Sequence, residues 1–147
     1  MEPGEEISVS LGIAEFLCEP EEISNVLGMS PSRIWRKDQP IPPIGNTLGI
    51  ADTRPTRIAD YNKWVYRLKL DQTASLDQFL SAFLDAFWPF RTYLSNLAGP
   101  TKIYLSLYLA YDIEQYPNLS INGIIFNPKL IQLLADLRAS VGIDINI

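Results

Sequence analysis

Residues 103–110 read Ile-Tyr-Leu-Ser-Leu-Tyr-Leu-Ala, and their alternation indicates the architecture of the whole chain. An apolar residue stands at every odd position, whereas tyrosine, serine or alanine stands at every even one. A period of two is typical of a β-strand, because successive side chains point to opposite faces of a sheet. We expect a central strand here, with one apolar face and one face that carries tyrosines.

Five further segments have strand patterns around this central one. In residues 63–70, for example, aromatic and aliphatic residues alternate with Lys63, Val65, Arg67 and Lys69, so one face is apolar and the other is polar or bound. The five segments are residues 7–14, 33–37, 63–70, 119–126 and 143–147.

Helix signals separate these strands and predict helices at residues 20–28, 75–98 and 128–141. Gly28 is placed to end the first helix, and Gly142 the last. Ser75 and Gln78 have the spacing of a capping box, which marks a helix start. Pro89 removes a backbone hydrogen bond in the second helix, so we expect a kink there or two separate helices.

This order of elements predicts one α+β domain with two layers. The sheet would be mixed or mostly antiparallel, with five to six strands and three helices mainly on one face. The length of 147 residues suits a single domain. Residues 38–60 hold four prolines and form a long Pro-rich loop, and loops of this length are usually functional or partly disordered.

The composition excludes several kinds of chemistry. The chain has no histidine, which removes Ser-His-Asp and Cys-His catalysis and histidine metal ligands. Its one cysteine, Cys18, can form neither an internal disulfide nor a zinc cage. The N-terminus lacks the basic start of a secretory signal, and no apolar run approaches the roughly 20 residues that span a bilayer. We therefore expect a cytoplasmic protein.

Charge is unevenly distributed along the chain. The chain has 12 basic and 17 acidic residues and a net charge of −5, which disfavours general nucleic-acid binding. Residues 1–22 carry seven acids and no base, whereas residues 33–69 carry eight bases and three acids. The basic segment also contains tryptophan and tyrosine.

This basic and aromatic segment is the main candidate for a binding site. Arginine grips a carboxylate or phosphate at two points, and an adjacent indole can stack or hold a cation. If the strands at 33–37 and 63–70 are neighbours, these side chains share a surface. The candidate residues for a ligand or partner are Arg33, Trp35, Arg36, Lys37, Arg67 and Lys69. The alternative is a solvated sheet face whose cations balance the acidic N-terminal region.

The acidic start of the chain is a second candidate, for docking a basic protein such as a nuclease-like toxin. Its acids are Glu2, Glu5, Glu6, Glu15, Glu19, Glu21 and Glu22. The alternative is that these acids provide solubility, and that Glu21 and Glu22 are favoured by the positive end of a helix.

Two further features have structural explanations that we favour. Asp112 and Glu114 follow a strand and could act as acid and base, but residues at such positions usually form a turn. Cys18 precedes a helix, where a thiol can become reactive. With no histidine to assist it and acids nearby, we expect a small buried residue instead.

The tyrosines of the central strand are the last candidate. Tyr104 and Tyr108 share a strand face, and Tyr66 could lie near them on a neighbouring strand. Such a cluster can line a ligand groove or a dimer contact. Aromatic residues at strand spacing more often pack under a helix, and we favour that interpretation here.

A family resemblance covers most of the chain. Residues 19–31 read Glu-Pro-Glu-Glu-Ile-Ser-Asn-Val-Leu-Gly-Met-Ser-Pro, and Trp35-Arg36-Lys37 follows. This start resembles the small bacterial family known as domain of unknown function 4279. The Trp64 strand, the Ser75-Leu76 helix start and the ending through residues 130–137 and Gly142-Ile143-Asp144-Ile145 are similar too. The shared motifs are structural, so the resemblance implies a fold and carries over no activity or site residue.

We therefore expect a non-enzymatic protein that binds a partner protein, with neutralisation of a toxin as one version. One alternative is a domain or enzyme that binds a small anionic ligand through the basic and aromatic face. Another is a homo-oligomeric structural protein or homodimer, suggested by a charged fraction of only 20%. No catalytic residue, metal ligand or cofactor is assigned, and we expect no membrane binding.

Overall fold

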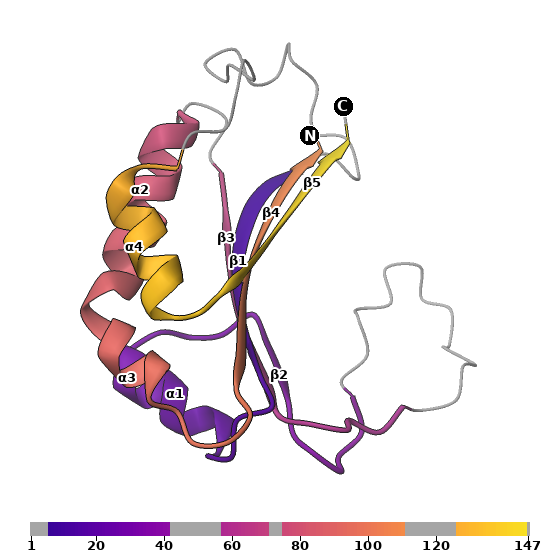
Figure 1. Cartoon of the computed structure of the whole chain (residues 1–147). Helices are drawn as coiled ribbons and strands as arrows, with labels where there is room; N and C mark the ends of the chain where they lie inside the picture. Colours follow the sequence, from indigo (N-terminus) through magenta and orange to yellow (C-terminus); the bar gives the residue numbers. More distant parts are fainter. Residues whose placement is uncertain (1–5, 42–56, 71–74, 111–125, 147) are drawn as a thin grey trace.

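Five strands form one mixed sheet in the computed structural model, which describes residues 6–41, 57–70, 75–110 and 126–146. The strand order is β2-β3-β1-β4-β5, so the first strand of the chain occupies the middle of the sheet (Figure 1). The strands are β1 Glu6–Ala14, β2 Arg33–Trp35, β3 Lys63–Lys69, β4 Lys102–Ala110 and β5 Ser140–Asn146.

Strand pairing makes the sheet mixed. Strand β1 runs antiparallel to both β3 and β4, and β2 runs antiparallel to β3. Strand β5 runs parallel to β4, with Ile143 beside Leu107. Because the chain passes through a helix before β5, it returns to the same end of the sheet from which β4 starts.

All the described helices lie on one side of this sheet (Figure 1). They are α1 Pro20–Leu27, α2 Leu76–Phe87, the 3₁₀ turn η1 Trp88–Phe90, α3 Arg91–Ser95 and α4 Pro128–Asp136. The structure thus confirms the expected α+β class, with helices on one face of a mixed sheet of five strands. The helices bury apolar stripes against the sheet, which leaves the opposite face of the sheet to polar and aromatic residues.

Local signals explain where the helices begin and end. Gly28 ends α1 with φ +66°, a left-handed conformation that side chains with a Cβ rarely adopt. At the start of α2, the Ser75 hydroxyl accepts a hydrogen bond from the Gln78 backbone N–H, and the Gln78 side chain returns the contact. Pro89 falls in η1, so the predicted helix at 75–98 is divided, as expected.

The last helix is shorter than predicted. Instead of reaching residue 141, α4 ends at Asp136, and Arg138 takes φ +52°. Gly142 does not end a helix; it lies in β5 opposite Ser106 of β4. Val141, expected on the inward side of the helix, is also a strand residue and is 44% exposed. Pairing with β4 therefore determines the structure of this segment, which the helix pattern alone did not predict.

Three other expectations concern segments that are short or incompletely described. The predicted strand at 33–37 is formed only over Arg33–Trp35. The predicted strand at 119–126 lies outside the described residues except for its last position. The ends of the Pro-rich loop run side by side, because the Asp38 N–H donates to the Ala59 carbonyl at 2.8 Å and Pro40 pairs with Ile58.

The core fills the space between the sheet and the helices. Trp64 is fully buried there, and its indole N–H donates to the Ser24 hydroxyl of α1 at 3.0 Å. Tyr66 lies on the same side and meets Phe87 edge to face at 5.6 Å. The largest fully buried side chains are Trp64, Phe16, Phe83, Phe87, Ile7, Leu11, Ile13, Ile23, Leu94, Leu105 and Leu107.

Candidate functional site

The face of the sheet opposite the helices, called the outer face below, has a distinct composition. Its β1 residues are small: Ser8, Ser10, Gly12 and Ala14. The neighbouring strands place long side chains on either side of them. Strand β3 contributes Lys63, Val65, Arg67 and Lys69, and β4 contributes Lys102, Tyr104, Ser106 and Tyr108.

One end of the outer face holds cations packed against aromatic rings. Strand β2 places Trp35 opposite Lys63 of β3. The Lys63 ammonium lies 4.4 Å from the centroid of the Trp35 ring and 5.7 Å from that of Tyr104. The Arg33 guanidinium carbon lies 5.8 Å from the centroid of the Trp35 ring. The centroid of the Tyr61 ring also lies 5.8 Å from that of Trp35. We call Arg33, Trp35, Tyr61, Lys63 and Tyr104 the cation–aromatic cluster.

Gly12 lets the Tyr104 ring complete this cluster. The two residues are cross-strand partners, and a Cβ at position 12 would lie 2.1 Å from the Tyr104 Cζ atom. The ring therefore lies directly on the β1 backbone, within reach of the Lys63 ammonium. A larger residue at position 12 would move the ring off this place.

Three polar groups of the cluster have no hydrogen-bond or ion-pair partner within the described residues. The Trp35 Nε1 atom is closed to solvent and donates no hydrogen bond to any group in the described part of the chain. Within the same residues, no carboxylate forms an ion pair with Arg33 or Lys63. An unpaired buried donor costs roughly 1–3 kcal/mol. The cluster thus offers three groups that can only donate, of which two are cationic, and its tyrosine hydroxyls can donate or accept.

An acid next to the cluster is already engaged. Glu15, which follows β1, forms an ion pair with Lys102 at 2.8 Å. Hydrogen bonding to Glu15 and the charge of that carboxylate together raise the pKa of Lys102. Because Glu15 is held by Lys102, it is not the partner of Lys63.

The structure divides the six predicted site residues. Arg33 and Trp35 belong to the cation–aromatic cluster. Arg67 and Lys69 lie farther along the outer face of β3, and Arg67 Nε contacts the buried Ser8 hydroxyl at 3.4 Å. The condition on which the prediction depended is met, since β2 and β3 are neighbours.

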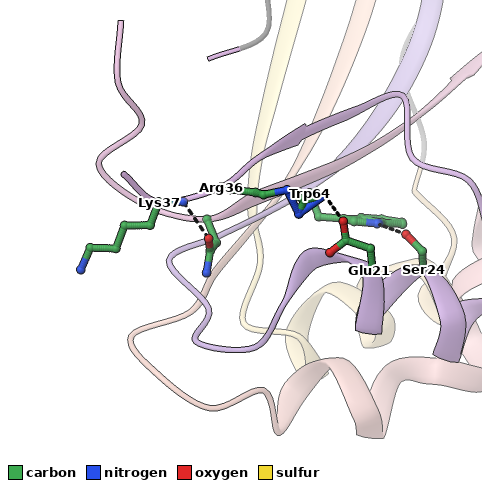
Figure 2. A network of polar contacts seen from close by, with 6 residues as sticks. Glu21, Ser24, Arg36, Lys37 and Trp64 are labelled. Atoms are coloured by element: carbon green, nitrogen blue, oxygen red, sulfur yellow. Dashed lines mark hydrogen bonds and ion pairs between the residues drawn. The ribbon is translucent and has the colours of Figure 1, made fainter. Parts of the chain in front are cut away.

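Arg36 and Lys37 follow β2 and do not belong to the cation–aromatic cluster, and Figure 2 shows Arg36 directed at Glu21. Arg36 forms an ion pair with Glu21 of α1, on the helix side of the sheet. Alternation explains this, because the residue after Trp35 points to the opposite face. The Lys37 backbone N–H donates to Asn62 Oδ1 at 2.8 Å, and its exposed side chain points away from the protein. Grouping residues by charge alone therefore joined two opposite sides of the sheet.

Sequence reasoning missed Tyr61 and Lys63 as members of a site, and it considered Tyr104 only in a separate cluster with Tyr108 and Tyr66. The alternation in β3 and β4 did assign Lys63 and Tyr104 to polar faces, but it gave no strand order. The expectation that the tyrosines pack under a helix is wrong for Tyr104, which lies over Gly12 on the outer face. Tyr66 lies on the opposite, helix-covered side.

Of the remaining candidates, Cys18 lies within the described residues and is not activated there. Burial, followed by the nearby charge of Glu22, raises the pKa of the Cys18 thiol, so the unreactive protonated form is favoured. Asp112 and Glu114, proposed as a carboxylate pair, lie outside the described residues. No group of side chains suited to hold a metal ion occurs in the described ranges.

The acidic N-terminal region is partly occupied by internal contacts. Glu21 pairs with Arg36 and Glu15 with Lys102. Glu2 and Glu5 fall outside the described residues. Of the helices that the structure describes, none combines the length and apolarity needed to cross a bilayer.

The chain belongs to the family described as "Domain of unknown function (DUF4279)", whose model matches residues 5–147. This match confirms the resemblance seen in the sequence and extends over nearly the whole chain. Comparison with curated proteins found no match, and neither did comparison with solved structures.

Proposed function

We propose that this member of the DUF4279 family is a non-enzymatic interaction module that binds an acidic surface of a partner protein through its outer face. The observation that supports the proposal is the cation–aromatic cluster, in which Arg33 and Lys63 have no acidic partner within the described residues. In a chain with a net charge of −5, cations concentrated on one face favour a partner of opposite charge.

The composition of this face also suits protein binding. Tryptophan, tyrosine and arginine are the residues enriched where binding energy concentrates in protein interfaces. Here they lie on β-strands, whose positions are fixed by a packed core on the other side of the sheet. A toxin with an acidic docking surface would be one partner of this kind. Because Glu15 and Glu21 are engaged internally, the outer face is better supported as a docking surface than the acidic N-terminal region.

A photo-crosslinking residue tests the proposal directly. We would place it at Tyr108, on the outer face of β4, and at the exposed Ala82 of α2 as a matched position on the helix side. The full chain is then irradiated in lysate of its source organism. We expect a defined protein adduct from position 108 and none of the same mass from position 82.

Charge reversal separates specific docking from adventitious crosslinking. Lys63→Glu should remove the adduct formed at position 108. Lys129→Glu changes the charge of the chain equally, but at the start of α4, and should leave the adduct intact. An adduct that survives Lys63→Glu, or the same proteins captured from both positions, would contradict docking on the outer face.

A further inference from the structure

The Trp35 indole is the most unusual group on the outer face. Of the three tryptophans, Trp64 donates its indole N–H to Ser24, whereas the Trp35 N–H is closed to solvent and has no acceptor in the described chain. Buried polar groups are nearly always hydrogen-bonded, and an exception calls for an explanation. One explanation is an acceptor that arrives with a ligand.

The neighbours of this indole determine what kind of acceptor fits. The Lys63 ammonium lies over the Trp35 ring, and the Arg33 guanidinium lies beside it. Both groups are donors only and carry positive charge. A cationic ligand is therefore repelled, and a neutral ligand leaves two charges unpaired. An anion with oxygen acceptors matches all three groups.

We propose that the cation–aromatic cluster binds a carboxylate of an acidic segment of the partner protein. One carboxylate oxygen would accept the Trp35 indole N–H and the other would pair with Lys63, with Arg33 adding positive charge beside them. Phosphate sites in proteins commonly use arginine forks or the N–H groups of a helix N-terminus. The three donor groups of this cluster lie on strands and include a single arginine, so a carboxylate is the better match.

The Lys63 side chain is the movable part of the site. Its ammonium contacts the Trp35 and Tyr104 rings and no carboxylate within the described residues, and a lysine stem has several rotatable bonds. A carboxylate that pairs with the ammonium would draw it from the ring and approach the edge of the indole. The rings are held more firmly, because Tyr104 lies on the β1 backbone at Gly12.

Nuclear magnetic resonance can observe the critical donor directly. In the ¹⁵N-labelled full chain, the three tryptophans give three indole N–H signals, and Trp35→Phe identifies one of them. The probes are a hexaglutamate peptide, inorganic phosphate, and sodium chloride at matched ionic strength. We expect hexaglutamate to shift the Trp35 signal with saturation and to leave the Trp64 signal in place.

Trp88 provides an internal control for non-specific attraction. Its ring also contacts two cations, Arg91 at 4.1 Å and Lys129 at 4.9 Å, but on the helix side. General condensation of an anion on cations would shift the Trp88 signal as well as that of Trp35. Selective movement of Trp35 is therefore the expected result, and equal movement of both signals would overturn the proposal.

Two lysine variants measure the contribution of the site. Lys63→Gln should weaken hexaglutamate binding by roughly tenfold, the size expected for losing one charged hydrogen bond. Lys129→Gln, which removes a cation from another tryptophan ring, should bind as the unmodified chain does. An unchanged Trp64 signal in both variants confirms that the fold is retained, because neither lysine contacts that ring in the described chain.

The remaining outcomes decide between sources of the anion. Phosphate shifts at the same concentration as hexaglutamate would overturn the assignment to a carboxylate, and shifts produced equally by sodium chloride would overturn any specific site. This inference rests on the proposed function, but the experiments can contradict the carboxylate site without contradicting docking on the outer face. Loss of the photo-crosslinked adduct in Lys63→Glu with no Trp35 shift would retain outer-face docking and remove the carboxylate site.

Discussion

The two faces of the sheet differ in how their side chains are packed and how their tryptophan indoles are hydrogen-bonded. On the helix side, the β1 residues Ile7 and Leu11 are fully buried, and even the Trp64 indole has its hydrogen bond. On the outer face, Gly12 accommodates a tyrosine ring and the Trp35 indole has no acceptor in the described chain. The helix side therefore holds the packed core, while the outer face carries an indole N–H that has no acceptor within the described residues.

The largest effect should come from a cavity on the helix side. Leu105 of β4 is fully buried, so Leu105→Ala should lower the free energy of unfolding by about 2–5 kcal/mol. Its neighbour Ser106 points to the outer face, and Ser106→Ala should change the free energy of unfolding by about 0.5 kcal/mol or less. Urea denaturation of both variants measures the difference. Equal losses would show that the outer face is packed as tightly as the core.

A second substitution makes the two indoles alike. Ser24→Ala removes the acceptor of the Trp64 N–H and leaves it buried and unpaired, as the Trp35 N–H is. The free energy of unfolding should fall by about 1–3 kcal/mol. Ser81→Ala, at an exposed site on α2, is the matched control. A stability unchanged by Ser24→Ala would mean that water replaces the lost hydroxyl.

A smaller effect is expected at the start of α2, which covers the helix side. Ser75→Ala removes the hydroxyl that caps this helix and should cost about 1 kcal/mol. Gln78→Ala removes the other half of the capping box, so a double-mutant cycle should show coupling between the two. Strictly additive losses in thermal or urea denaturation would indicate that the box does not act as a unit.

The smallest effect on the free energy of unfolding is expected from the titration of Cys18 with pH. Burial and the charge of Glu22 raise the pKa of this thiol in the folded chain. The folded state therefore binds the thiol proton more tightly than the unfolded state does. This difference adds to the free energy of unfolding, and the addition is fully present below the pKa of the unfolded thiol. That contribution is lost as the pH rises through the higher pKa of the folded thiol.

The rate of alkylation by iodoacetamide measures the pKa of this thiol. We expect its midpoint at higher pH in the native chain than in the urea-unfolded chain. Glu22→Gln should lower the native midpoint, whereas Glu21→Gln, which removes the partner of Arg36, should not. A native midpoint at or below the unfolded one would contradict a raised pKa of Cys18 in the folded chain.

Sequence patterns predicted those parts of the fold that depend on local interactions. The alternation in residues 103–110, the capping box at Ser75 and the left-handed Gly28 each act within a few residues, and the structure contains all three. Gly142 shows where local reasoning stops. A glycine can end a helix or lie in a strand, and pairing with Ser106 in a distant strand decides between the two.

The candidate site was less predictable, because it depends on contacts between distant segments. Trp35, Lys63 and Tyr104 come from three strands, and no local pattern gives the order of those strands. The contact of the Tyr104 ring with Gly12 follows from the register of β1 and β4, which no local pattern gives. Arg36 was included for its charge, although alternation places it on the other side.

The central position of β1 also affects how the chain is synthesised and folded. Of the five described strands, β1 leaves the ribosome before the others, yet its partner β4 ends only at Ala110. Contacts between such distant segments slow folding, and an apolar strand without a partner is prone to aggregate. Charged residues beside such a strand suppress aggregation, and Glu5, Glu6 and Glu15 stand at its two ends. Acids at both ends of β1 are therefore where charge would oppose aggregation of this strand before β4 is made.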